Sequence, residues 1–158
     1  MTIPTEIERK FLVDEVPEDL DIGSREEIAQ GYLATGDHQV RLRRQGDRPL
    51  LTAKRGRGLV RDEVEVPLEE ESFERLWPLT EGRRLKKERL TATVDGQTVE
   101  VDVYRGPLAG LIVAEVEFEG IDAARAFSPP EWFARELTDD ARYSNQRLAL
   151  EGLPVEEE

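Results

Sequence analysis

The feature that most constrains the fold is a two-residue alternation of apolar and ionised side chains that returns along the chain. Its first instance is the stretch 6–11, in which the ionised residues Glu6, Glu8 and Lys10 fall at every second position. Later instances are VRLR (40–43), EVEV (63–66), VEVDV (99–103) and AEVEF (114–118). A period of two places successive side chains on opposite faces of a β-strand. The pattern therefore predicts strands with one apolar face and one charged face.

Turn-forming residues separate these segments by short distances. Hairpin turns are predicted at Gly36-Asp37, at Gly46-Asp47, in the loop 55–58 and at Asp95-Gly96. Helices are predicted near residues 24–29, 69–77 and 121–126, after Pro129-Pro130, and over 144–150. Since short connections join antiparallel neighbours, the sequence predicts an α+β fold with about eight antiparallel strands.

Composition and charge narrow the class of protein. A chain of 158 residues fits a single domain, expected over residues 1–154, with a disordered acidic tail at 155–158. The net charge of −13 argues against nucleic acid or an anionic membrane as the general partner. The sequence has no cysteine, no signal peptide and no apolar run of membrane length, so a cytoplasmic protein is expected. His38, the only histidine, is expected in a solvated turn, which argues against histidine-based catalysis.

The charged faces have two interpretations. Taken alone, each strand could turn its charges to water, as half-buried strands commonly do. Taken together, the charges are sorted by sign: basic residues lie on three strands (Arg41, Arg43, Lys54, Lys87, Arg89) and acidic residues on three others (Glu63, Glu65, Glu100, Asp102, Glu115, Glu117). If eight strands close into a barrel, these faces meet in a common lumen. The apolar faces then look outward, and helices packed outside and at the ends would cover them.

A lumen lined with both signs of charge calls for a ligand, because buried charges must be paired or must bind ions. Its basic groups would hold a polyphosphate through charge-assisted hydrogen bonds. Its carboxylates would bind Mg²⁺ or Mn²⁺, which prefer oxygen ligands. The metal would neutralise phosphate charge and make a bound water more acidic for attack on phosphorus. The residues therefore indicate metal-assisted cleavage of a phosphoanhydride.

The opening Glu6-Ile7-Glu8-Arg9-Lys10 is an ExExK motif. Further motifs follow in order: QGYL (30–33), VRLR (40–43), LTAK (51–54), RDEVE (61–65), EGRR (81–84), EVDV (100–103), AEVEF (114–118) and RYSN (142–145). Together they resemble the CYTH superfamily, the triphosphate tunnel metalloenzymes, and its short bacterial members in particular, over nearly the whole chain. One segment departs from the family: Lys87-Glu88-Arg89 stands where members often carry Lys-Thr-Arg, with Glu88 expected on the outward face.

The resemblance implies an eight-stranded antiparallel tunnel, often in a homodimer. It implies Mg²⁺- or Mn²⁺-dependent hydrolysis of inorganic triphosphate to pyrophosphate and phosphate. By matching motifs, it implies metal ligands at Glu6, Glu8, Glu115 and Glu117, and phosphate-binding residues at Lys10, Arg41, Arg43, Lys54, Lys87 and Arg89. Glu63 and Glu65 would serve a second metal or orient water, and Lys10 would also act in catalysis. Tyr32 resembles the tyrosine proposed as proton acceptor in some short members; the alternative is an aromatic side chain that closes one end of the tunnel.

Other activities stay open at this point. The same fold hosts relatives that act on thiamine triphosphate or RNA 5′-triphosphate ends, and class IV-type adenylate cyclases that act on ATP. Cyclisation of ATP needs a nucleoside pocket, for which the sequence offers no residues, and RNA ends fit poorly with an acidic surface. A non-catalytic polyphosphate-binding module is a further alternative. The acidic strands argue against it, because a pure anion binder has no use for carboxylates that face its ligand.

Overall fold

The computed structural model describes residues 4–155, and these form one antiparallel sheet with short helices. Its strands are β1 (Thr5–Val13), β2 (Asp21–Ala34), β3 (His38–Gln45), β4 (Arg48–Arg55), β5 (Val60–Pro67), β6 (Arg84–Val94), β7 (Gln97–Tyr104), β8 (Ile112–Phe118) and β9 (Phe133–Glu136). Its helices are α1 (Glu70–Leu76), α2 (Ile121–Ala126) and α3 (Asn145–Glu151), with 3₁₀ helices η1 (Trp77–Thr80), η2 (Gly106–Leu108) and η3 (Ala141–Tyr143). Residues 156–158 of the expected acidic tail lie outside the described residues.

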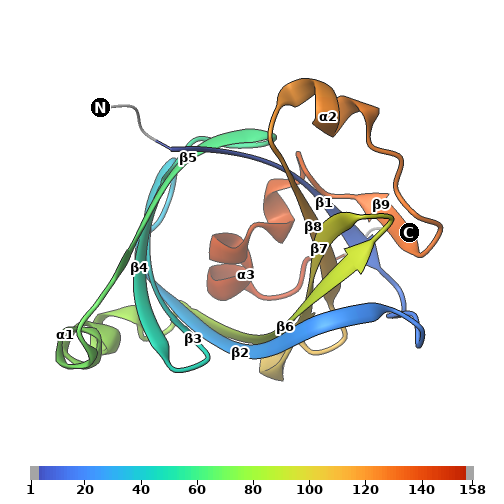
Figure 1. Ribbon diagram of the computed structural model, residues 1–158. Coiled ribbons are helices and arrows are strands. Elements are labelled where there is room, and N and C mark those ends of the chain that lie inside the picture. The colour runs from blue at the N-terminus through green and yellow to red at the C-terminus, as the bar shows by residue number, and fades with distance from the viewer. Residues whose placement is uncertain (1–3, 156–158) are drawn as a thin grey trace.

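The sheet closes on itself through the first strand. The strand order is β5-β4-β3-β2-β6-β7-β8-β1-β9, and β1 also pairs with β5 through Thr5↔Asp62 and Ile7↔Val60. Eight strands therefore form a barrel, and the short β9 pairs with β1 outside the closed circle. Figure 1 looks into this barrel and shows α3 inside the ring of strands, with α1 and α2 outside it. The predicted eight-stranded antiparallel barrel with added helices is confirmed.

The outer face of β1, β6, β7 and β8 carries the main apolar core. Phe11, Leu90, Val101 and Val116 are buried there, because the segment around β9 and α2 covers them. The ring of Phe11 lies 4.9 Å from that of Phe133 on β9. Burial of these aromatic and aliphatic side chains stabilises the strands from outside. On the inner face, Leu85, Tyr104 and Val113 form a second apolar cluster with Leu148 of α3, and charged and polar residues line the rest of the lumen.

The outer face of β5 has less cover. Phe73 of α1 is buried beside β4, but Val60, Val64 and Val66 remain 40–44% exposed. The expectation that helices cover the outward apolar faces thus holds for the β1 side of the barrel and fails for β5.

Two predicted helices are strands instead. Residues 24–29, expected to be a short helix, belong to β2, which pairs with β6 through Arg25↔Leu90 and Ile28↔Lys87. The segment after Pro129-Pro130, also expected to be helical, forms β9 against β1. In both places, pairing with a strand distant in sequence outweighs the local signal for the start of a helix. Pairing satisfies the hydrogen bonds of the backbone and buries side chains such as Ile28.

The predicted hairpins are present, and the clearest joins β6 to β7. Asp95 and Gly96 both have positive φ, at 50° and 77°, as the two central residues of a type I′ turn require. His38 begins β3 directly after the turn at Gly36-Asp37 and is exposed. The short connections place consecutive strands side by side, so the inward positions alternate regularly around the barrel.

Asp140 gives the fold a pH-dependent contribution. Its carboxylate accepts hydrogen bonds from the backbone and guanidinium of Arg142 and from Arg135, which lowers its pKa from 3.8 to about 2. A carboxyl group whose pKa is lower in the folded than in the unfolded state stabilises the fold at pH values above its unfolded-state pKa. This contribution is lost as the pH falls through the folded-state pKa. We expect Asp140→Asn to lower the free energy of unfolding by about 1 kcal/mol or less at pH 6, since the site is partly solvated. Urea unfolding should show roughly half of that difference at pH 3; an equal difference at both pH values would contradict this cause.

Candidate active site

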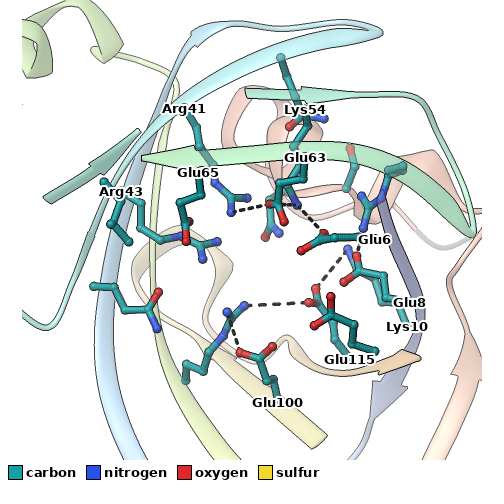
Figure 2. A pocket seen from close by; sticks show the side chains of 18 of the residues that line it. Glu6, Glu8, Lys10, Arg41, Arg43, Lys54, Glu63, Glu65, Glu100 and Glu115 are labelled. Atoms are coloured by element: carbon teal, nitrogen blue, oxygen red, sulfur yellow. Dashed lines mark ion pairs between the residues drawn. The ribbon is translucent and has the colours of Figure 1, made fainter. Parts of the chain in front are cut away.

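The inner faces of the strands enclose a cavity of about 280 Å³. All but one of the residues that the sequence suggested for the site line it: Glu6, Glu8, Lys10, Tyr32, Arg41, Arg43, Lys54, Glu63, Glu65, Arg89, Glu115 and Glu117. Figure 2 shows the labelled carboxylates, guanidiniums and ammonium groups directed toward one shared space. The residues come from strands far apart in the sequence, and barrel closure brings them together. The expectation that the charged faces converge on a lumen is confirmed.

Lys87 is the exception among the suggested residues. Its side chain is fully buried and does not line the cavity, and its Nζ lies 2.6 Å from Asp102 Oδ2. Asp102 is also fully buried and accepts two hydrogen bonds from Arg89, at 2.8 and 3.0 Å. Burial alone would raise the pKa of Asp102, but the charges of Arg89 and Lys87 lower it well below its usual range. Lys87 and Asp102 thus form an ion pair behind the cavity wall.

The cations of the cavity repel one another. Burial lowers the pKa of Arg43 to about 9, and the charges of Arg41 and Arg89 add to the effect. Burial and the charge of Arg41 likewise lower the pKa of Lys54. Arg41 is only 4% exposed, its nearest acid is Glu63 at 3.7 Å, and its Nε has no hydrogen-bond partner. Since buried donors without partners are costly, this corner of the cavity favours an anion with several acceptor oxygens.

The carboxyl groups of Glu6 and Glu63 meet beside these cations. Burial raises the pKa of Glu6 to about 8, helped by a hydrogen bond with Glu63. Burial alone would also raise the pKa of Glu63, but that hydrogen bond and the charges of Lys54 and Arg41 lower it to about 2. The raised pKa of Glu6 beside the lowered pKa of Glu63 therefore favours one shared proton on this pair over two negative charges. A position where two carboxyl oxygens share a proton is also one that a hard cation can take.

Most remaining carboxylates already have a basic neighbour. Glu8 pairs with Arg61, and Glu100 lies 2.8 Å from Arg89. Glu115 lies 3.8 Å from Lys10, whose charge, together with that of Arg89, lowers the carboxyl pKa to about 2 against the opposing effect of burial. Within residues 4–155, no three acidic side chains converge closely enough to form a ready cation site. The donor set fits a divalent cation in its chemistry, but side chains would have to turn away from their present partners to bind one.

Several residues of the cavity wall were not among the suggested site residues. They are Gln39, Gln45, Arg48, Leu50, Arg61, Ser144 and Asn145, together with Glu100, which the sequence placed on a lumen-facing strand without assigning it a role. Arg61 alternates with Glu63 and Glu65 on the inner face of β5, so the two-residue period could have predicted its position. Ser144 and Asn145 lie at the start of α3, where a two-residue period gives no information. The departing residue Glu88 faces outward as expected, where it lies 3.7 Å from Arg25 and 3.6 Å from Arg105.

A closed barrel of eight antiparallel strands with a charged lumen defines a tunnel protein, and comparisons identify its family. The model of the CYTH domain matches residues 4–148, so the chain belongs to the CYTH family. It is 47% identical to the inorganic triphosphatase of Nitrosomonas europaea, over 92% of this chain and 97% of the relative. It is 36% identical to the inorganic triphosphatase of Acetivibrio thermocellus, over 90% and 92% of the two chains. The crystal structure of the inorganic triphosphatase NE1496 superposes with a TM-score of 0.73 at 43% identity, covering 98% of this chain and all of that one.

The comparisons bear on cofactor and location only in part. Triphosphatases of the CYTH family are in general metalloenzymes, which agrees with the many carboxylates of the cavity. Of the residues that the structure describes, no helix has the length and apolar character needed to cross a membrane. The cytoplasmic location stays a prediction.

Proposed function

We propose that the protein hydrolyses inorganic tripolyphosphate to pyrophosphate and phosphate inside its tunnel, with a divalent metal ion. The observation that carries this proposal is the cluster of Arg41, Arg43 and Lys54, buried together in the cavity, where burial and the charge of Arg41 lower the pKa of both Arg43 and Lys54 and the Arg41 Nε has no partner. Such a cluster is unfavourable until a polyanion enters. The relatives named inorganic triphosphatase support the same substrate.

The size and lining of the cavity favour an inorganic chain of phosphates over a nucleotide. At about 280 Å³ the cavity lies just below the range of about 300–1,000 Å³ typical of sites for drug-sized ligands. Its wall is charged or polar apart from Leu50 and the ring of Tyr32, so little apolar surface is available to hold a base or a thiazolium ring. Thiamine triphosphate, ATP and RNA ends are therefore expected to be poorer substrates than tripolyphosphate.

We assign the basic residues to substrate binding. Arg41, Arg43 and Arg89 would donate to phosphate oxygens in the bidentate manner that guanidinium allows, and Lys10 and Lys54 would act as compact charges. Lys10 Nζ already donates to the Tyr143 carbonyl at 3.2 Å, which fixes its direction. These donors would stabilise the charge that develops on the phosphoryl oxygens during transfer. Lys10 therefore belongs to both binding and catalysis.

The acidic residues would hold the metal. Glu6, Glu8, Glu115 and Glu117 offer the oxygen ligands that Mg²⁺ and Mn²⁺ prefer, and Glu63 and Glu65 would bind a second ion or orient the attacking water. When bound there, a divalent cation supplies neutralisation of phosphate charge and a more acidic water. The shared proton of Glu6 and Glu63 would be released as the carboxylates take up this role.

Tyr32 would accept a proton during the reaction. It is fully buried, lines the cavity, and its oxygen accepts a hydrogen bond from Gln30, which is in turn held by Arg43. We expect Tyr32→Phe to lower kcat about 100-fold, as loss of a general base does, with KM within about three-fold. Steady-state phosphate release with tripolyphosphate checks this. If kcat instead changes by less than about three-fold, the tyrosine only closes one end of the tunnel.

A substrate panel tests the function as a whole. Purified protein is mixed with tripolyphosphate, pyrophosphate, ATP or thiamine triphosphate, each with Mg²⁺, Mn²⁺ or a chelator, and released phosphate is measured. We expect turnover of tripolyphosphate in the presence of a metal, and much slower release of phosphate from pyrophosphate, ATP and thiamine triphosphate. Binding of tripolyphosphate without release would favour a polyphosphate-binding module. Formation of cyclic AMP from ATP as the main reaction would favour a cyclase.

We further propose that the protein is a homodimer through the outer face of β5. The exposed Val60, Val64 and Val66 form an apolar strip there, which a second copy would cover. Light scattering after size-exclusion chromatography should give a dimer for the wild type and a monomer for Val64→Glu. A wild-type monomer at the same concentration would contradict the dimer and leave the triphosphatase proposal unaffected.

A further inference from the structure

In the segment RYSN (142–145), the Tyr143 carbonyl directs Lys10, and the next two residues, Ser144 and Asn145, reach the cavity wall. Ser144 caps α3: its hydroxyl oxygen accepts a hydrogen bond from the Arg147 amide at 3.3 Å. The cap fixes where the helix begins, and Asn145 is its first residue. Asn145 is therefore a rigidly placed amide on the wall of the triphosphate cavity.

The oxygen of this amide is directed away from the cavity. Asn145 Oδ1 accepts a hydrogen bond from the Tyr104 hydroxyl at 2.5 Å and another from Lys87 Nζ at 3.5 Å. Tyr104 and Lys87 are buried behind the wall and do not line the cavity. Lys87 is itself fixed by Asp102, which Arg89 holds through two hydrogen bonds. The buried network thus reaches from the cavity cation Arg89 to Asn145.

The identity of Lys87 determines which end of the amide faces it. Lys87 Nζ forms an ion pair with Asp102 and donates to the oxygen of Asn145, to which the Tyr104 hydroxyl also donates. The two hydrogen atoms on Nδ2 must then lie on the opposite side of the amide. Within residues 4–155, Nδ2 donates to no partner, while the residue itself lines the cavity.

We propose that Asn145 is a further substrate-binding residue, which donates a hydrogen bond from Nδ2 to a phosphate oxygen of the triphosphate in the tunnel. This inference rests on the proposed function. Lys87 and Tyr104 are then positioning residues: they orient the amide and do not touch the substrate. A neutral donor suits this position, because another cation would add to the repulsion that already lowers the pKa of Arg43.

The sharpest test is Asn145→Asp. Aspartate keeps an oxygen acceptor for Tyr104 and Lys87, so the network and the start of α3 are preserved, but the amide donor becomes a second oxygen. We expect KM for tripolyphosphate to rise about 10- to 100-fold with kcat within about three-fold, because a lost donor is replaced by a repelling charge. Asn145→Ala, which adds no charge, should raise KM about 3- to 10-fold, the usual effect of one neutral hydrogen bond.

A matched control lies one residue along the helix. Gln146→Glu makes the same amide-to-acid change at a side chain that bonds to the Gly36 backbone and does not line the triphosphate cavity. Its KM should stay within about two-fold of the wild type. Tyr104→Phe removes one of the two hydrogen bonds to Oδ1 and should raise KM less than Asn145→Ala does. Thermal unfolding of each variant checks that the fold is intact.

The outcomes separate this inference from the function on which it rests. If the wild type hydrolyses tripolyphosphate while Asn145→Asp and Asn145→Ala keep a wild-type KM, the role of Asn145 is overturned and the function stands. An equal rise of KM in Gln146→Glu also overturns it, since the effect would then come from charge alone. If the wild type shows no turnover, titration calorimetry with tripolyphosphate in the presence of chelator tests the role of Asn145 in binding. The affinity of Asn145→Ala for tripolyphosphate must then be lower than that of the wild type. Absence of both turnover and binding in the wild type overturns both proposals.

Discussion

Arg41→Ala should lower kcat/KM for tripolyphosphate about 100- to 1,000-fold, the effect of losing one preorganised charged donor in a catalytic site. Arg41 is buried, lines the cavity, and has an Nε without a partner, so most of its hydrogen-bonding capacity remains for a ligand. Steady-state phosphate release over a range of tripolyphosphate concentrations measures the change. Arg41→Lys should recover only part of the activity, because an ammonium cannot make the paired contacts of a guanidinium.

Stability provides the second readout for Arg41. The charge of Arg41 lowers the pKa of both Arg43 and Lys54, so its removal relieves repulsion inside the barrel. We therefore expect the free energy of unfolding of Arg41→Ala to equal or exceed that of the wild type, as is common when a functional site is dismantled. Arg75→Ala, at an exposed position of α1, is the matched control and should leave activity unchanged. A less stable Arg41→Ala with wild-type activity would assign the residue to structure.

Removal of divalent metal should abolish detectable turnover, and added Mg²⁺ or Mn²⁺ should restore it. The reason is that no other group in the cavity can neutralise the phosphate chain and acidify water together. Glu117→Gln should lower kcat/KM about 100-fold or more at low metal concentration, with partial recovery as the metal is raised, because the variant loses a ligand and keeps the substrate-binding cations. Phosphate release at increasing metal concentration measures both effects.

Glu119→Gln is the matched control for the proposed metal ligand Glu117. Glu119 lies just beyond β8, is exposed, and does not line the cavity. Its metal requirement should equal that of the wild type. Full activity in chelator, or the same metal requirement in Glu117→Gln and the wild type, would refute a metal bound at Glu117.

The alternation of charge along the strands predicted which residues share the charged face of each strand. Glu6, Glu63 and Glu117 lie far apart in the sequence, and the two-residue period placed each on such a face, which could have turned to water or to a lumen. Turn chemistry at pairs such as Asp95-Gly96 predicted the antiparallel neighbours. Closure of the sheet followed from the resemblance to a known family and from the sorting of charge sign, and it is the step that converts separate charged faces into one cavity.

The remaining errors share a physical origin in long-range contacts. Nothing local in residues 24–29 reveals the β6 ladder that makes them a strand, and β9 exists only because β1 offers an edge. Lys87 has the same parity as Arg89, but its depth in the barrel leaves it facing Asp102 and not the cavity. Asn145 was overlooked because α3 enters the ring of strands, and no periodic pattern encodes where a helix will point.

The strand that closes the barrel precedes all of its partners in the chain. β1 pairs with β5, β8 and β9, so each of these strands is synthesised after it, β5 before β8 and β9. Before these pairings form, the edges of β1 are unpaired, and its alternating Glu6, Glu8 and Lys10 disfavour association of those edges with other strands. Pairings this distant in sequence make folding slow, on the scale of about milliseconds to seconds. The same three side chains that line the finished tunnel are thus of the kind that disfavours edge-to-edge association of an unpaired strand.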